Sequence, residues 1–125
     1  MKIIDKIFMF HMAVADMDKS KEFYTDKLGF IVTNDYGQGD QHWVSLDIPG
    51  GAPSLNLTTS HENMKPGTMK LYLSTPDIKA AYEELKTKGA KPATEITDDL
   101  YGPGSGVKWF SLNDPDGNKL MIVQS

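Results

Sequence analysis

Hydrophobic and polar positions alternate along several short segments of the chain and follow a helical spacing in two others. In the first half, this pattern predicts strands over 6–15, 29–36, 42–48 and 54–60, and a helix over 17–28. The helix is expected to carry Met17, Ser20, Tyr24 and Leu28 on one face. Asp16 is the expected N-cap, and Gly29 is the expected stop, because glycine accepts the positive φ that ends many helices.

The second half repeats the same order of elements. Strands are predicted over 68–74, 93–100, 106–113 and 119–125, and a helix over 77–89. The helix carries apolar residues at i, i+3, i+4 and i+7, namely Ile78, Ala81, Tyr82 and Leu85. Thr75 is the predicted N-cap, with Pro76 at the first helical position. The last two strands are joined by the turn sequence "DPDGN".

This repetition predicts one domain, 1–125, built from two similar modules. Asp77 lies 61 residues after Asp16, and the modules span about 1–62 and about 66–125. Each module alone leaves one face of its sheet uncovered. We therefore predict an α+β fold in which two modules meet edge to edge around a concave, ligand-binding surface with the helices outside.

Composition excludes several classes of protein. The formal net charge is -4 and the 13 basic residues are dispersed, which argues against nucleic-acid or anionic-membrane surfaces. No apolar run reaches the roughly 18 residues of a membrane span. The N-terminal stretch is too short for a secretion signal and contains His11, so we expect no cleavage. Cysteine is absent, which excludes disulfides and fits a cytoplasmic location.

Three stretches carry a family resemblance: "MAVADMDKSKEFYTDKLGF", "LSTPDIKAAYEELKTKGAKP" and "FSLNDPDGNKLMIV". Together they resemble the vicinal oxygen chelate superfamily, which includes glyoxalases, bleomycin-resistance proteins and extradiol dioxygenases. The resemblance implies two βαβββ modules forming a curved mixed sheet, with a concave cavity inside and the helices outside. It does not fix the activity, because one fold hosts many functions.

The resemblance also implies four metal-ligand positions, which this chain fills with Met9, Asn56, Lys70 and Met121. Divalent ions prefer imidazole or carboxylate ligands, so these residues make a poor metal site. We therefore expect no metal and no cofactor, and the chain leans away from being an enzyme. Catalytic residues are not assigned.

His11 lies two residues after Met9 and is expected on the same face of its strand. Three interpretations stay open: a histidine hydrogen-bonded to a neighbour on the sheet, a contact to a ligand, or a metal ligand. An improvised metal site of His11 and His42 is conceivable, with Glu95 or Asp47 as the carboxylate.

The expected cavity is lined by residues of both modules. Lys70 is a candidate contact for an anionic ligand, although a solvated structural lysine is the commoner interpretation. Alternation across the "DPDGN" turn places Trp109, Ser111 and Met121 on one face. The predicted cavity residues are Met9, His11, Asn56, Lys70, Trp109 and Met121.

The leading hypothesis is a metal-independent small-molecule binding protein of the glyoxalase/bleomycin-resistance type. Sequestration of an antibiotic or metabolite is its expected role, and the resemblance implies a homodimer. The first alternative is a metal-dependent glyoxalase-like lyase, isomerase or dioxygenase that uses other ligands. A non-catalytic partner domain in a regulatory assembly is the second alternative.

Overall fold

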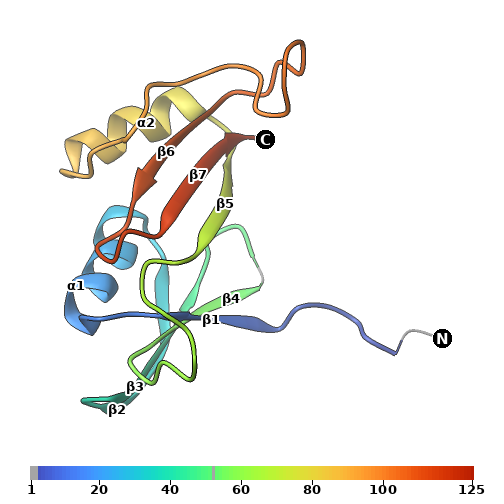
Figure 1. Cartoon of the computed structure of the whole chain (residues 1–125). Coiled ribbons are helices and arrows are strands. Elements are labelled where there is room, and N and C mark those ends of the chain that lie inside the picture. The colour runs from blue at the N-terminus through green and yellow to red at the C-terminus, as the bar shows by residue number, and fades with distance from the viewer. Residues whose placement is uncertain (1–2, 52) are drawn as a thin grey trace. The chain divides into compact units, whose positions relative to one another are not determined.

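The computed structural model describes residues 3–51 and 53–125. The chain divides into two compact units, Met1–Pro66 and Gly67–Ser125, which are described separately below (Figure 1). Among the described residues, no helix has both the length and the apolar character needed to cross a membrane.

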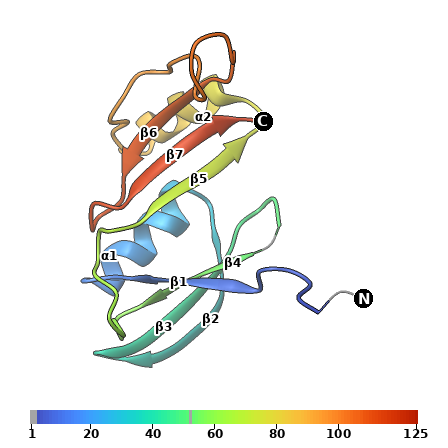
Figure 2. The ribbon, with the colours of Figure 1, turned by 45° about the vertical axis from the view of Figure 1, so that its right-hand side comes forward.

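The first unit is a four-stranded mixed sheet with a helix on one face (Figure 2). Its elements are β1 (Met9–Ala13), α1 (Met17–Glu22), a π-helical turn (Phe23–Lys27), β2 (Ile31–Gln38), β3 (Gln41–Asp47) and β4 (Ser54–Thr58). The strand order is β1-β4-β3-β2, in which β1 runs parallel to β4 and the other neighbours are antiparallel.

The first unit's core lies between α1 and the sheet. Alternate strand residues, which point to one face, are fully buried: Met12, Val44, Leu46, Leu55 and Leu57. Burying a side chain of this size contributes about 1.5–3 kcal/mol. The expected N-cap is confirmed, because the carboxylate of Asp16 accepts a hydrogen bond of 3.1 Å from the backbone N–H of Lys19.

The second unit is a three-stranded sheet with α2 on one face. Its elements are β5 (Lys70–Thr75), α2 (Ile78–Thr87), β6 (Trp109–Asn113) and β7 (Lys119–Gln124). The order is β5-β7-β6, with β5 parallel and β6 antiparallel to β7. The ring of Tyr82 on α2 meets the buried Phe110 of β6 edge-on, with centroids 5.1 Å apart. Both units mix helices with sheet, which confirms the α+β class.

One predicted strand is wrong. Residues 93–100 form no ladder and touch β6 through two isolated bridges, Pro92 with Leu112 and Thr97 with Trp109. Pro92 and Thr97 are five residues apart whereas their partners Leu112 and Trp109 are three apart, so the two chains are out of register between the bridges. Pro92 also has no N–H to donate, and Asp99, with a positive φ of 64°, leaves the extended conformation. The second unit therefore has three strands among its described residues instead of four.

The predicted start of the second helix is also wrong. Thr75 belongs to β5, and the N-cap is Asp77, whose carboxylate accepts a bond of 3.0 Å from the N–H of Ala80. Pro76 therefore precedes the cap. Aspartate is as good an N-cap as threonine or better, and it shifts the helix start by two residues.

Candidate functional site

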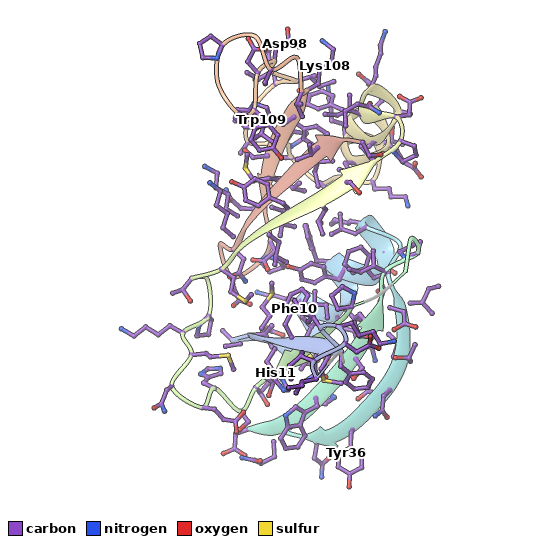
Figure 3. The ribbon with its side chains drawn as sticks, turned by 90° about the vertical axis from the view of Figure 1, so that its right-hand side faces the viewer. Phe10, His11, Tyr36, Asp98, Lys108 and Trp109 are labelled. Carbon is purple, nitrogen blue, oxygen red and sulfur yellow. The ribbon has the colours of Figure 1, made fainter. Side chains whose placement is uncertain are left out.

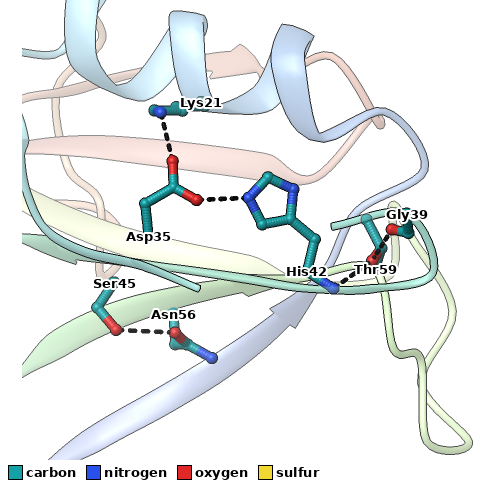
Figure 4. Close-up of polar contacts among 7 residues, drawn as sticks. All are labelled: Lys21, Asp35, Gly39, His42, Ser45, Asn56 and Thr59. Atoms are coloured by element: carbon teal, nitrogen blue, oxygen red, sulfur yellow. Dashed lines mark hydrogen bonds and ion pairs between the residues drawn. The ribbon is translucent and has the colours of Figure 1, made fainter. Parts of the chain in front are cut away.

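Three polar side chains form a hydrogen-bonded row across the first sheet, on the face opposite α1. Asn56 of β4 lies directly between His11 of β1 and Ser45 of β3 in the strand register. Its amide nitrogen and the Nδ1 of His11 are 2.7 Å apart, and the Ser45 hydroxyl donates to its carbonyl oxygen at 2.9 Å (Figure 4). We call this the Ser45–Asn56–His11 row.

The row fixes which nitrogen of His11 carries the proton. An amide nitrogen only donates, so in this contact Nδ1 of His11 accepts, which leaves Nε2 as the ring nitrogen that carries a proton. Asn56 is 3% exposed and both ends of its amide are used, whereas His11 is exposed. His11 therefore offers an oriented N–H donor on this face (Figure 3).

The same face carries polar and aromatic neighbours. Met9 pairs with Ser54, whose hydroxyl donates to the carboxylate of Asp47 at 2.8 Å. Beside Ser45 in β3, the half-buried Trp43 lies next to the exposed Tyr36 of β2, with ring centroids 6.4 Å apart. Such a face combines one donor with flat apolar surface, the usual ingredients of a small-molecule site.

The second unit contains a row in the equivalent place but with different chemistry. Tyr72 of β5, Met121 of β7 and Ser111 of β6 are register neighbours, as His11, Asn56 and Ser45 are in the first unit. The hydroxyl of Ser111 is buried and has no hydrogen-bond partner among the described residues. Methionine at the central position offers no amide that could link its two neighbours as Asn56 does.

Two further predicted site residues share this second face. Lys70 is exposed and its Nζ lies 5.4 Å from the centre of the Tyr72 ring. Trp109 is half-buried, two residues before Ser111 and opposite Val123.

The structure thus distributes the predicted site residues over two faces. Met9, His11 and Asn56 share one face of the first unit, and Lys70, Trp109 and Met121 share one face of the second, with Lys70 and Trp109 at its opposite ends. Sequence reasoning missed three residues of these faces: Ser45, Tyr72, and Lys119, which is the register partner of Lys70. Alternation within β3, β5 and β7 could have assigned their faces, but the cross-strand partners depend on register.

Residues 3–51 and 53–125 contain no group of three or more His, Asp or Glu side chains that could hold a metal ion. The improvised pairing of His11 with His42 does not form. His42 lies on the Val44 side of β3, whereas His11 and Ser45 lie on the other side of the sheet. Strand alternation separates them.

His42 instead belongs to an ion cluster at the edge of the first sheet. Asp35 accepts from Lys21 Nζ at 2.6 Å with one oxygen and lies 2.6 Å from His42 Nε2 with the other (Figure 4). Lys21 first, and His42 second, hold the pKa of the Asp35 carboxyl below its usual value. A lysine within the cluster opposes binding of a cation there.

Two bacterial proteins are similar to the chain over most of its length. It is 32% identical to the uncharacterized protein YurT of Bacillus subtilis (strain 168), over 95% of this chain and 98% of that protein. It is 26% identical to a probable lactoylglutathione lyase of Synechocystis sp. (strain ATCC 27184 / PCC 6803 / Kazusa), over 95% of this chain and 96% of that protein.

A solved structure is similar over almost its full length. The crystal structure of TnmS3, an antibiotic binding protein from Streptomyces sp. CB03234, matches with a TM-score of 0.79 and 27% identity, covering 99% of this chain and 98% of that one. The sequence pattern of one family matches residues 4–122. The chain belongs to the Glyoxalase/Bleomycin resistance protein/Dioxygenase superfamily.

Proposed function

We propose that this protein binds a small organic molecule without a metal ion, and that it acts by sequestering an antibiotic or a metabolite. The observation that carries the proposal is the state of Asn56. At one of the four positions that the resemblance implies for metal ligands, this chain has an uncharged amide whose two ends already serve Ser45 and His11. Similarity to an antibiotic binding protein at 27% identity supports the same interpretation.

Metal dependence is tested by elemental analysis and thermal melting. Protein purified without a histidine tag is expected to contain no stoichiometric metal. Its melting temperature is expected to stay constant with Zn, Ni, Mn, Fe(II) or Co, because only an ion that binds the native state raises it. One bound metal per chain, lost on His11→Ala, would overturn the proposal.

Ligand binding is measured by tryptophan fluorescence. The chain has two tryptophans, Trp43 on the polar face of the first unit and Trp109 on that of the second. A ligand on either face changes the emission of the nearer ring. Trp43→Phe and Trp109→Phe assign the signal, and a binding ligand must also raise the melting temperature.

The alternative is a metal-dependent lyase of the glyoxalase type. Similarity to a probable lactoylglutathione lyase at 26% identity favours it. Hemithioacetal isomerisation that appears with added metal and disappears in His11→Ala would establish it. If wild type and His11→Ala both show only the rate of the buffer without protein, the lyase alternative is excluded.

We further propose a homodimer in the cytoplasm. Support for association comes from the N-terminal segment, where Ile3, Ile4, Ile7 and Phe8 are each 67–87% exposed. A cluster of exposed apolar side chains of this kind commonly marks a protein interface. The absence of cysteine supports the location.

A further inference from the structure

Two lysines stand side by side on the polar face of the second unit. Lys70 of β5 and Lys119 of β7 are direct partners in the parallel register, and alternation puts both on the face of Tyr72 and Met121. Like charges directly opposite each other destabilise a sheet. The face therefore carries a local electrostatic cost unless something anionic binds there.

Neither lysine forms an ion pair with any residue of 3–51 or 53–125. Other lysines of the chain do: Lys21, Lys88 and Lys108 lie 2.6, 3.5 and 2.6 Å from Asp35, Glu84 and Asp98. The amine of Lys70 lies over the neutral ring of Tyr72 instead. A chain with net charge -4 thus leaves two adjacent cations without a carboxylate from the part of the chain that the structure describes.

The rest of the face is uncharged. The remaining strand residues that share it are Tyr72, Ser74, Trp109, Ser111, Asn113, Met121 and Val123. Two aromatic rings flank a flexible methionine, and the buried hydroxyl of Ser111 has no partner among the described residues. A buried hydroxyl of this kind has a hydrogen bond to gain from a ligand that reaches it.

We propose that this face binds an organic anion, a carboxylate or phosphate joined to an aromatic body. Lys70 and Lys119 hold the anionic group, and Tyr72 and Trp109 contact the body. Neighbouring strands lie about 4.8 Å apart and alternate residues about 6.7 Å apart, so the Cα atoms of Lys119 and Trp109 are roughly 14 Å apart. Both side chains are long and reach into this interval, which leaves space for an extended aromatic body of two or more rings. This inference rests on the proposed function and names its ligand class.

The test uses two fluorescent probes that share one aromatic body. The first, 8-anilinonaphthalene-1-sulfonate, carries an anion, and the second, N-phenyl-1-naphthylamine, lacks it. Wild-type protein is expected to bind the sulfonate more tightly, with an affinity that falls as salt rises. In the Lys70→Gln/Lys119→Gln variant, the affinity for the sulfonate falls roughly tenfold or more and that for the neutral probe is unchanged.

The matched control is Lys79→Gln/Lys91→Gln. These two lysines are exposed in the same unit but lie outside its strands. The control has the same net charge as the test variant, so it is expected to bind both probes as wild type does. Equal losses in the two variants would overturn the proposal, as would equal wild-type affinities for the two probes. Circular dichroism spectra confirm that both variants are folded.

Competition then separates the two anion types. Phenyl phosphate or benzoate is expected to displace the sulfonate in wild type, and whichever displaces more identifies the preferred group. Displacement by inorganic phosphate alone, at equal concentration, would overturn the role of the aromatic body. If neither EDTA nor the lysine substitutions change probe binding, only the inference about the two lysines is overturned. If EDTA abolishes probe binding, the proposed metal-independent function is overturned.

Discussion

The side chain of Asn56 shows how one residue sets the character of a face. It is buried at the centre of the first sheet and is bonded on both sides, to Ser45 and to His11. The equivalent place in the second sheet holds Met121, and there the serine hydroxyl of Ser111 stays without a partner among the described residues. Serine at equivalent positions therefore has different effects on stability: the hydroxyl of Ser45 stabilises the first unit through its hydrogen bond, whereas the buried hydroxyl of Ser111 does not stabilise the second in this way.

A matched pair of substitutions tests this difference. Ser45→Ala is expected to lower the free energy of unfolding by about 1–2 kcal/mol, because the buried carbonyl of Asn56 loses its donor. Ser111→Ala is expected to leave it unchanged to within about 0.5 kcal/mol or to raise it, because its hydroxyl has no hydrogen bond to a described residue that could be lost. Urea denaturation measures both. Equal costs would show that Ser111 has a partner.

The ion cluster of Asp35 predicts a pH dependence. Its folded-state pKa is lowered by Lys21 and His42, so its contribution to stability is present above the unfolded value of about 3.9. The contribution is lost as pH falls through the lowered folded value. Asp35→Asn is expected to cost about 0.5 kcal/mol at pH 7, since the pair is partly exposed and screened.

The check is urea denaturation of wild type and Asp35→Asn from pH 7 to pH 2. The difference between the two proteins should vanish as the pH falls well below about 4. Asp5→Asn, an exposed carboxylate outside the cluster, serves as the control and should show no such difference. A difference that widens in acid would contradict a lowered pKa for Asp35.

Among the elements, the two helices begin in the same way. Asp16 and Asp77 each cap the backbone N–H three residues ahead, at 3.1 and 3.0 Å. Asp77→Ala is expected to cost about 1 kcal/mol of unfolding free energy. Thr75→Ala should cost less, because its hydroxyl makes only long bonds of 3.3 and 3.4 Å to the Asp77 backbone. Thermal unfolding followed by circular dichroism compares the two variants. A larger loss of stability in Thr75→Ala than in Asp77→Ala would show that Thr75 is the cap.

Much of this element order was predictable because local patterns determine it. Period-two alternation located the strands of both units, and Asp16 was identified as a cap from its position before an apolar helix face. The strand predicted over 93–100 is wrong although the segment alternates, because Pro92 has no N–H for a ladder and Asp99 adopts a left-handed conformation that alternation does not reveal. The predicted cap Thr75 is wrong because Asp77, two residues later, caps the helix instead.

The candidate site was predictable only in part, because its contacts depend on register. His11 does lie on the face of Met9, and it is hydrogen-bonded to a sheet neighbour as one interpretation held. That the neighbour is Asn56 follows from the parallel pairing of β1 with β4, which joins residues 45 positions apart. No local pattern specifies such a pairing. The opposition of Lys70 and Lys119 has the same origin.

At the scale of the whole molecule, two units with a similar order of elements present two chemically different faces. The first is a hydrogen-bonded, uncharged row ending in the N–H donor of His11. The second is cationic at one end and aromatic at the other, from Lys70 to Trp109. One chain therefore offers a hydrogen-bond donor on the first face and cationic and aromatic contacts on the second, whereas two identical faces would offer only one of these.

Assembly of the whole molecule is tested through its exposed N-terminal side chains. Ile4 and Ile7 are 83% and 67% exposed, and burial in a dimer interface would remove them from water. Ile4→Glu/Ile7→Glu is expected to shift the sedimentation mass from about twice that of one chain toward 13.9 kDa, since two carboxylates per chain oppose burial. Ile31→Glu, at an exposed isoleucine of β2, should leave the mass unchanged. A wild type that sediments as a single chain at all concentrations would refute the dimer and leave the segment's apolar character to another partner.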